Sequence, residues 1–393
     1  NSVNNGGALA FGQNSTAVGA GSAAVASDSS AVGRGNTASG NASSAMGYFN
    51  TASGPQSSAV GLINTAAGGN SSAVGRSNSA SGFDSSAVGN GNTASEFNSS
   101  AVGQANTASG SSSSAMGRSN NASGFQSSAV GSFNTASDQN SSAVGHGNTA
   151  SSRGSSAIGF SNIASRLNSA AMGAYTGALA SGATAVGGAS GQTARLVRNA
   201  SNVLISVNGI PVTAAGENLD SITEVNGVPV GEAQLEAFIN SVNNGGALAF
   251  GQNSTAVGAG SAAVGSDSSA IGRSNTASGF FSSAVGYTNA AKGTQSSAFG
   301  FNSTATGVNS VAAGAQAGAL AIGASAFGGT TGLNATLTLD AGVLTAVNGV
   351  NVTATGDNLT DITHVNGVAV DADQLTAFIR TVNNGGALAF GQT

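Results

Sequence analysis

The chain has 393 residues, of which 61 are glycine, and only 6% of them are charged, against about 25% in an ordinary globular protein. Its net charge is −5 with no basic cluster, which argues against nucleic acid and anionic membranes as partners. The absence of cysteine excludes disulfides and thiolate metal sites, and no stretch approaches the ~20 apolar residues of a membrane span. Much of the hydrophobic content is alanine, so we expect a thin, repetitive structure rather than a large core.

The chain opens with NSVNNGGALAFGQ, which lacks the basic and apolar regions of a signal peptide, and so we expect an excerpt of a longer protein. An alanine then recurs every seven residues from Ala10 to Ala185, and again from Ala249 to Ala326. Triplets of the AVG and ASG types alternate at these alanines, which makes the true repeat 14 residues. An asparagine recurs with the same period at residues 36, 50, 64, 78, 92, 106, 120, 134, 148 and 162.

The repeat favours β-structure over a coiled coil, because a coiled coil needs large apolar residues at two heptad positions and few glycines. A solenoid fits better, with two short strands and two tight bends in each 14-residue turn. Glycine after one strand and asparagine before the next are the residues expected to adopt the left-handed backbone of these bends. We predict an all-β parallel roll.

Side chains alternate along a strand, so alanine points one way and the Val or Ser neighbour points the other way. We expect the alanines inside a thin roll and the Val-type row outside, where an exposed apolar stripe must be covered by another copy of the chain. The inverse assignment, with Val inside, is the alternative. The predicted trimer-interface residues are Val32, Met46, Val60, Val74, Val88, Val102, Met116, Val130, Val144, Ile158 and Met172.

The motif NNGGALAFGQ occurs three times and two related inserts precede its second and third copies. We therefore predict a first roll of about 13 turns at 1–190, a connector insert at 191–240, a second roll of about 6 turns at 241–330, a second insert at 331–380, and the start of a third roll at 381–393.

The inserts predict small β-rich connectors that end one roll and restart the next. Leu204–Val212 alternates and turns at Asn-Gly, which indicates a hairpin. The segments 231–239 and 371–379 indicate short helices with acidic residues in the first turn. A ligand-binding domain is the alternative for the inserts, and their acidic residues leave calcium binding open, although they lack EF-hand spacing.

Catalytic chemistry is not indicated anywhere in the chain. Of the two histidines, His146 occupies a variable bend position and His364 aligns with Glu224 of the other insert, so we read both as surface residues. The glycine-rich run at 258–265 lies inside the repeat and not between a strand and a helix, which argues against a phosphate loop. We predict no enzyme, no cofactor and no metal site.

Large side chains occur at the bends, where the repeat is free to vary. They are candidates for a surface-binding rail, and the alternative, which we favour, is that they stack on one another or seal the seam between chains. The surface-binding candidates are Phe49, Phe83, Phe97, Phe125 and Phe160.

The stretch NSSAVGRSNSASGFDSSAVG at 70–89 resembles the 14-residue repeat of YadA-like heads in trimeric autotransporter adhesins, and the resemblance covers roughly residues 8–190 and 247–330. It implies a left-handed parallel β-roll, a homotrimer, a place on the bacterial outer surface, and adhesion without a cofactor. The family's membrane anchor, coiled-coil stalk and neck sequence are not present in this sequence, and similar repeats occur in phage fibres.

We therefore expect an extracellular, rod-like head segment of a trimeric adhesin on the bacterial cell surface. It would attach to host matrix, cells or abiotic surfaces through many weak contacts. The alternative is a structural fibre or spacer of tandem modules without a receptor of its own, which the recurring restart motif favours.

Overall fold

The computed structural model describes residues 6–188, 196–329, 337–384 and 386–389, which form two compact units, Asn1–Asn168 and Ser169–Thr393. The predicted starts of both inserts, 191–195 and 331–336, lie outside the described residues, as do the chain ends at 1–5 and 390–393. Each unit is described separately below.

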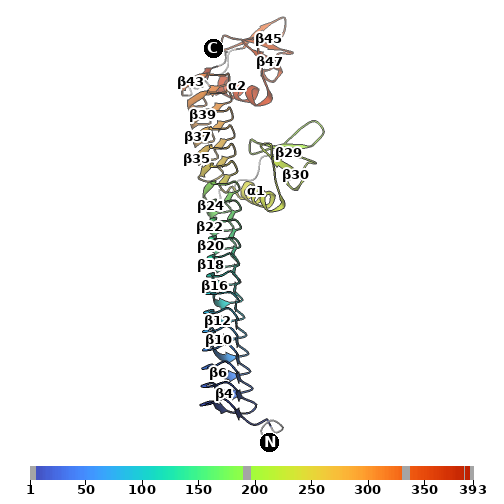
Figure 1. Cartoon of the computed structure of the whole chain (residues 1–393). Helices are drawn as coiled ribbons and strands as arrows, with labels where there is room; N and C mark the ends of the chain where they lie inside the picture. Colours follow the sequence, from blue (N-terminus) through green and yellow to red (C-terminus); the bar gives the residue numbers. More distant parts are fainter. Residues whose placement is uncertain (1–5, 189–195, 330–336, 385, 390–393) are drawn as a thin grey trace. The chain divides into compact units, whose positions relative to one another are not determined.

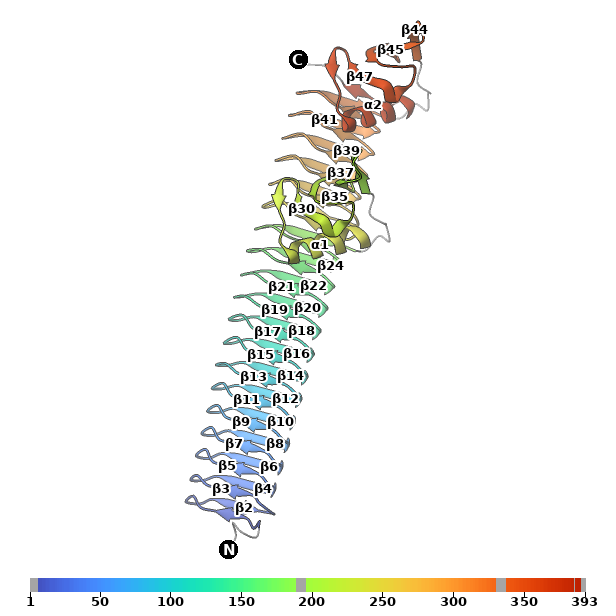
Figure 2. The same cartoon turned by 90° about the vertical axis from the view of Figure 1, so that its right-hand side faces the viewer.

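The first unit is a parallel β-solenoid in which long and short strands alternate (Figures 1 and 2). The long strands are β2 (Thr16–Val18), β4 (Ser30–Arg34), β6 (Ser44–Tyr48), β8 (Ser58–Leu62), β10 (Ser72–Arg76), β12 (Ser86–Asn90), β14 (Ser100–Gln104), β16 (Ser114–Arg118), β18 (Ser128–Ser132), β20 (Ser142–His146) and β22 (Ser156–Phe160). The short strands are β1 (Leu9–Ala10), β3 (Ala23–Ala24), β5 (Thr37–Ala38), β7 (Thr51–Ala52), β9 (Thr65–Ala66), β11 (Ser79–Ala80), β13 (Thr93–Ala94), β15 (Thr107–Ala108), β17 (Asn121–Ala122), β19 (Thr135–Ala136), β21 (Thr149–Ala150) and β23 (Ile163–Ala164).

Every strand pairs in register with the strand one turn away, so that identical side chains stack above one another. Val74 pairs with Val88 in the long-strand sheet, and Ala80 pairs with Ala94 in the short-strand sheet. Four surfaces result. We call the outer surface of the long strands the valine face and that of the short strands the serine face. The bend after each long strand is edge A, and the bend after each short strand is edge B.

Alanine fills the inside of the roll, as predicted. Ala73, Ala80, Ala87 and Ala94 each have 0% of their surface exposed, whereas the Val-type residues lie on the outside at intermediate or higher exposure. The inverse assignment, with Val inside, is therefore wrong. The space between two facing strands accepts only a methyl group on every turn, because both sheets are close enough for alanines to meet.

A ladder of asparagine side chains also runs inside the first unit. Asn92 is fully buried, and its Nδ2 donates to Asn78 Oδ1 at 3.0 Å, to the Val88 carbonyl at 2.9 Å and to the Gly103 carbonyl at 2.7 Å. Its own Oδ1 accepts from the backbone N–H and the Nδ2 of Asn106, both at 3.0 Å. The ladder satisfies bend carbonyls that would otherwise be buried without partners.

The predicted left-handed role of these asparagines is wrong. The left-handed residue of edge A is the one before each asparagine, for example Phe49 with φ 53° and Ile63 with φ 56°. The asparagine must instead turn its amide inward, because only there does it reach the carbonyls of its own turn and of the next one. The prediction for glycine is confirmed, since Gly89 has φ 121° and a Cβ built on it would lie 2.0 Å from the Gly103 carbonyl oxygen.

The second unit repeats this roll and carries both inserts (Figure 1). Its long strands are β24 (Ala170–Ala174), β26 (Thr184–Gly187), β33 (Thr255–Val257), β35 (Ser269–Arg273), β37 (Ser283–Tyr287), β39 (Ser297–Phe301), β41 (Val311–Ala315) and β43 (Ser325–Gly328). Its short strands are β25 (Gly177–Ala178), β32 (Leu248–Ala249), β34 (Ala262–Ala263), β36 (Thr276–Ala277), β38 (Ala290–Ala291), β40 (Thr304–Ala305), β42 (Gly318–Ala319) and β49 (Leu388–Ala389).

Each insert is a β-meander, a single 3-10 turn and a helix. The first holds β27 (Leu196–Arg198), β28 (Leu204–Val207), β29 (Ile210–Ala214), η1 (Leu219–Ser221), β30 (Ile222–Val225), β31 (Val228–Pro229) and α1 (Glu232–Asn244). The second holds β44 (Leu337–Asp340), β45 (Val343–Val347), β46 (Val350–Ala354), η2 (Leu359–Asp361), β47 (Ile362–Val365), β48 (Val368–Ala369) and α2 (Ala372–Asn384). The predicted hairpin and both predicted helices are confirmed.

The roll does not end at an insert. Strand β25 pairs directly with β32, Ala178 with Ala249, in the same parallel register that neighbouring turns use elsewhere. The first insert therefore occupies the position of a single edge A bend. Helix α1 runs through Asn244, past the start of the second roll predicted at 241, because Gly245 with φ 67° caps it and forms the first bend residue. Gly246 follows directly against the backbone of Tyr175.

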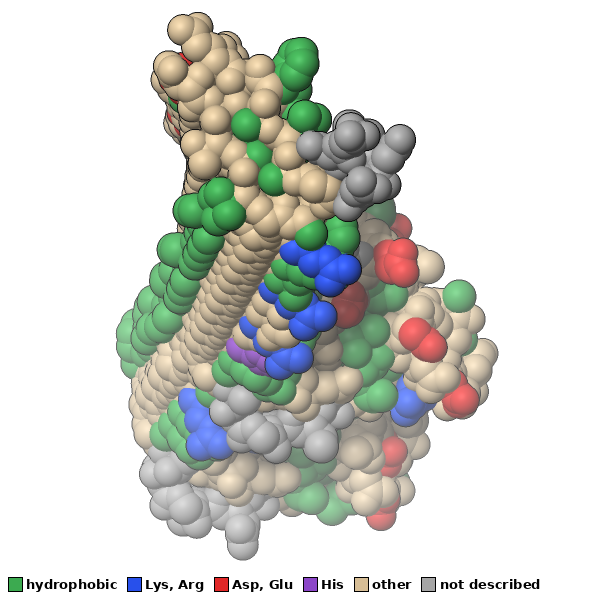
Figure 3. All heavy atoms as spheres, turned by 90° about the horizontal axis from the view of Figure 1, so that it is seen from below, with side chains coloured by type: hydrophobic (Ala, Val, Ile, Leu, Met, Phe, Trp, Pro, Cys, Tyr) green, Lys and Arg blue, Asp and Glu red, His purple; other side chains and the backbone are tan. Residues whose placement is uncertain are grey.

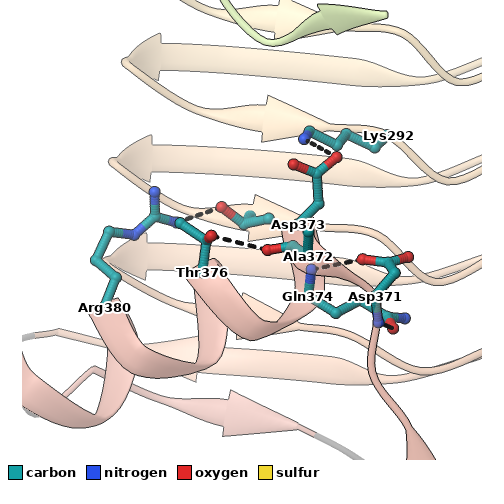
Figure 4. A network of polar contacts seen from close by, with 8 residues as sticks. Lys292, Asp371, Ala372, Asp373, Gln374, Thr376 and Arg380 are labelled. Atoms are coloured by element: carbon teal, nitrogen blue, oxygen red, sulfur yellow. Dashed lines mark hydrogen bonds and ion pairs between the residues drawn. The ribbon is translucent and has the colours of Figure 1, made fainter. Parts of the chain in front are cut away.

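Both helices lie against the serine face of the second unit. In the first insert, Gln234 Nε2 donates to the Leu179 carbonyl at 3.2 Å, and the second insert repeats this bond from Gln374 to Leu320 at 3.1 Å. Figure 4 shows the second helix, where Lys292 and Asp373 form an ion pair at 2.6 Å and Arg380 donates to Thr304. Burial lowers the pKa of the Arg380 guanidinium. Two sequence-related inserts therefore dock in the same way.

Removal of the first insert tests whether the roll is continuous. We expect that replacing residues 188–246 with the Asn-Gly bend of residues 90–91 leaves the roll folded, because β25 and β32 keep their register. The variant also carries Leu179→Ser, Leu248→Thr and Phe250→Ser. These three side chains are buried, with only 1%, 2% and 3% of their surface exposed. The thermal midpoint, followed by circular dichroism, should change by less than about 5 °C.

A matched variant keeps the three apolar residues on the shortened chain. It should fold to the same β content but aggregate more readily, because Leu179, Leu248 and Phe250 become an exposed patch. If the substituted variant loses its β signal, then the insert is required to start the next turn, and the continuity inferred from the strand pairing is wrong.

Candidate functional site

The valine face is a regular apolar surface of the first unit. Its residues are partly exposed in the single chain, with 41% for Met46, 36% for Val102 and 40% for Ile158. Because neighbouring strands pair in register, Val74, Val88 and Val102 stack directly above one another. All the predicted trimer-interface residues of this unit, Val32 to Ile158, lie in this one row.

The second unit continues the pattern, with 41% exposure for Ile271, 39% for Phe299 and 69% for Phe327 on its valine face. The predicted Met172 lies in β24 and pairs with Val186. Here the serine face is partly covered by the inserts, so that Thr276 and Thr304 have only 8% and 5% of their surface exposed. The valine face is therefore the apolar surface that the inserts leave open.

The predicted surface-binding phenylalanines lie at two separate edges of the first unit. Phe49 and Phe160 belong to edge A, whereas Phe83, Phe97 and Phe125 belong to edge B. All five are about half exposed, between 42% and 51%. They do not form one continuous rail, because edges A and B lie on opposite sides of the roll.

Ring contacts join some of these aromatics along the edges. Phe83 stacks on Phe97 with ring centroids 6.0 Å apart, and His146 stacks on Phe160 at 5.2 Å. Phe125 has no ring partner in the part of the chain that the structure describes. Stacking of the candidates on one another, one part of the reading favoured from the sequence, is found for Phe83 with Phe97, whereas Phe160 stacks on His146 and Phe49 meets the ring of Tyr48 edge to face.

A shallow hollow of about 420 Å³ lies on edge B of the first unit. The ring of Phe83 bounds it, and this ring leans against Gly69, where an added Cβ would lie 2.9 Å from the ring. Proline and three amide side chains complete the lining, from Asn41, Pro55, Gln56 and Asn70. The hollow is open and carries no titratable group, so it offers no chemistry beyond weak contact.

Large residues at edge A adopt an unusual backbone. Phe49, Ile63 and Phe133 have φ values of 53°, 56° and 57°, a region that bulky residues seldom enter. Each of them exposes about half of its surface to solvent. The bend geometry is imposed by the hydrogen-bonded turns above and below, so the edge tolerates almost any side chain and can vary without disturbing the roll.

Catalytic or metal-binding groupings are not found among the described residues. No three His, Asp or Glu side chains gather there in a way that could hold a metal ion. His146 lies between the rings of Phe133 and Phe160 at edge A, and His364 contacts the neighbouring Thr363 hydroxyl in the second insert. Within the described ranges, neither α1 nor α2 is long and apolar enough to cross a bilayer.

The family model for the YadA head domain repeat matches more than half of the chain, in segments that follow the 14-residue turns. The matched residues are 6–22, 10–36, 24–50, 38–62, 52–78, 80–96, 94–120, 122–148, 150–176, 245–268, 263–289, 277–303 and 291–317. Residues 177–244 and 318–393, which include both inserts and some strands of the roll, are not matched. A search of curated proteins finds no match.

Proposed function

Because the chain belongs to the YadA head repeat family, we propose that it is a surface-exposed head segment of a trimeric bacterial adhesin. It attaches to host matrix, cells or abiotic surfaces by non-catalytic binding. The observation that carries the proposal is the valine face, an in-register apolar row with exposures of 36–54% at its most open positions in the first unit. A row of this kind requires cover from another chain.

The position of the inserts supports the valine face as the contact between chains. Helices α1 and α2 contact the serine face of the second unit through Gln234 and Gln374. A chain that joins others through its valine face therefore keeps both inserts on the outside of the assembly. Three parallel chains also present each weak binding site three times, which raises the avidity of attachment.

One experiment tests both halves of the proposal. We expect the wild-type chain to sediment as a trimer and to bind surfaces coated with collagen, fibronectin or plain polystyrene. The double variant Val74→Asp, Val102→Asp should sediment as a monomer, because each carboxylate would be buried without a partner in the interface. Its attachment should fall at least about a hundredfold, as expected when multivalency is lost.

A matched control places the same charges on the serine face of the first unit, at Ser81 and Ser95, which are exposed or partly exposed. Ser81→Asp, Ser95→Asp should remain trimeric and attached. A monomeric wild-type chain would overturn the assignment of the valine face.

The second candidate function is a structural spacer. It is favoured by the repeated bend motif, since the roll resumes in register after the first insert and again at β49 after the second. A stable wild-type trimer that binds none of the coated surfaces would support the spacer over the adhesin.

A further inference from the structure

The carboxylates of the first unit lie on one edge of the roll only, whereas its arginines lie on both edges, with Arg153 and Arg166 on edge B. Edge A carries Arg34, Arg76 and Arg118 and no carboxylate. All four acidic residues of this unit lie on edge B, and they are Asp28, Asp84, Glu96 and Asp138. Among the described residues of the unit, none of the three edge A arginines forms an ion pair. Figure 3 shows basic side chains gathered along one side of the roll.

Two of these arginines have an aspartate at their own level on the opposite edge. Arg34 follows Asp28 by six residues, and Arg76 precedes Asp84 by eight. With 14 residues to a turn, each separation is close to half a turn, or about 2.4 Å along the stacking direction. Arg118 lacks such a neighbour, because Glu96 and Asp138 are more than one turn away in opposite directions.

The aspartates are held in place from the turn below. Asn14 Nδ2 donates to Asp28 Oδ1 at 3.1 Å, and Asn70 Nδ2 donates to Asp84 Oδ1 at 2.9 Å. Both aspartates are exposed and adopt left-handed backbone, with φ 56° and 54°. One carboxylate oxygen of each aspartate is thus held by an amide, and among the described residues of the unit no positively charged side chain forms an ion pair with either aspartate.

The arginine side is ordered as well. The Arg34 guanidinium lies over the ring of Tyr48, 5.6 Å from its centroid, which holds the side chain along edge A. The second unit repeats the whole arrangement. Arg273 lies over Tyr287 at 5.7 Å, and it follows Asp267 by six residues. Asp267 Oδ1 accepts from Asn253 Nδ2 at 3.1 Å.

We propose that these groups form ion pairs between chains, with Arg34, Arg76 and Arg273 of edge A meeting Asp28, Asp84 and Asp267 of edge B on the next chain. The inference rests on the proposed trimer. In a cyclic trimer whose valine faces meet at the axis, each chain contacts its two neighbours through two different edges. Rotation about an axis along the rolls keeps equal residue numbers at equal heights, so each arginine faces the aspartate at its own level.

The pairs would make edge A of one chain meet edge B of the next. They would also favour the alignment in which equal residue numbers lie at equal heights over one shifted by a turn. The apolar valine row cannot do this, because a slip of 14 residues places one valine where another was. In the unshifted alignment all three pairs lie within about half a turn, whereas a slip of one turn in either direction moves at least one pair about one and a half turns apart, which favours the unshifted alignment.

Charge reversal tests the pairing in the full chain. Arg34→Glu with Arg76→Glu should slow trimer formation from denatured chains about tenfold at low salt, measured by light scattering, because each trimer then holds six like-charge contacts. The effect should shrink in 1 M salt, where the Debye length is about 3 Å. Adding Asp28→Arg and Asp84→Arg to the same chain should restore the rate.

Arg118→Glu is the matched control, since it has the same edge and a similar stacked guanidinium over Phe133 at 5.3 Å, but no aspartate at its level. It should change the rate less than twofold. An equal loss for Arg118→Glu, or no recovery in the fourfold swap, would overturn the pairing while the trimer itself stands. A wild-type chain that never trimerises would instead overturn the proposed function.

A second readout gives the geometry directly. The wild-type chain has no cysteine, so Arg34→Cys with Asp28→Cys introduces the only two thiols. A bis-maleimide that spans an arginine–aspartate pair should convert this variant into covalent trimers on a denaturing gel. Arg118→Cys with Asp28→Cys should yield few, because these positions lie six turns apart along the stack. Equal yields from both variants would contradict matched levels.

Discussion

Gly89→Ala is expected to break the roll at one turn and to destabilise it by more than about 3 kcal/mol. The residue has φ 121°, which an L-residue with a side chain rarely adopts, and its new Cβ would lie 2.0 Å from the Gly103 carbonyl oxygen. The obstacle is backbone of the next turn and cannot rotate away. Urea unfolding measures the loss, and hydrogen exchange of the amides in β10, β12 and β14 should locate it.

Gly91→Ala is the control for this prediction, two residues further along. Gly91 also has positive φ, 66°, but no atom lies within 4 Å of the position of an added Cβ. We expect a cost of about 1 kcal/mol, from the left-handed backbone alone. Equal effects of the two substitutions would mean that the close approach of successive turns is not what selects glycine.

Asn92→Ala is expected to destabilise the roll by about 3 to 5 kcal/mol. The change removes the three acceptor contacts that the two N–H groups of Asn92 Nδ2 share, and the two bonds that its Oδ1 accepts from Asn106. The carbonyls of Val88 and Gly103 then lose this partner, and water reaches them only by opening the turn. The free energy of unfolding and local hydrogen exchange are the measurements.

The matched control is Asn90→Ala, which removes the same side chain from an exposed position at edge A of the same turn. It should alter stability by less than about 0.5 kcal/mol. If Asn92→Ala is as mild as Asn90→Ala, the internal amide ladder is dispensable and the stacked strands alone hold the roll.

The repeat period and the in–out alternation of the roll could be predicted because both depend on local rules. Alternation along a strand places Ala87 and Val88 on opposite sides, and only the smaller one fits inside every turn. The hairpin at Asn208-Gly209 also follows from its two residues, whose turn brings Val207 opposite Ile210.

The role of the repeated asparagine could not be read in the same way. Asparagine is compatible both with left-handed bends and with internal hydrogen bonding, and its period does not separate these roles. The left-handed residue proved to be its predecessor, where phenylalanine, isoleucine, serine and glycine all occur. The sequence did hold a signal for the internal role. A position that only needs positive φ would vary, as that predecessor does, whereas asparagine recurs in most turns at the position of Asn92.

Sequence spacing alone also did not predict which charged and aromatic residues share an edge of the roll. The arginines and aspartates are few and scattered along the chain, and they fall on opposite edges only after the two bends of each turn are assigned. Likewise, Phe83 and Phe97 share an edge with Phe125 but not with Phe49. The sequence predicts a helix that ends at 239 rather than at Asn244, because Asn244 belongs to the motif NNGGALAFGQ, which also stands at the start of the predicted first roll.

The parallel ladder has a consequence for mechanical load within each unit. Successive turns are joined by hydrogen bonds that run along the stacking direction, for example from the Thr93 N–H to the Asn106 carbonyl at 2.8 Å. A pull in that direction loads the turns in series, so a single chain would peel one turn at a time, each releasing about 45 Å of chain. A tether that must resist tension therefore gains its strength from contacts between chains, which share the load side by side.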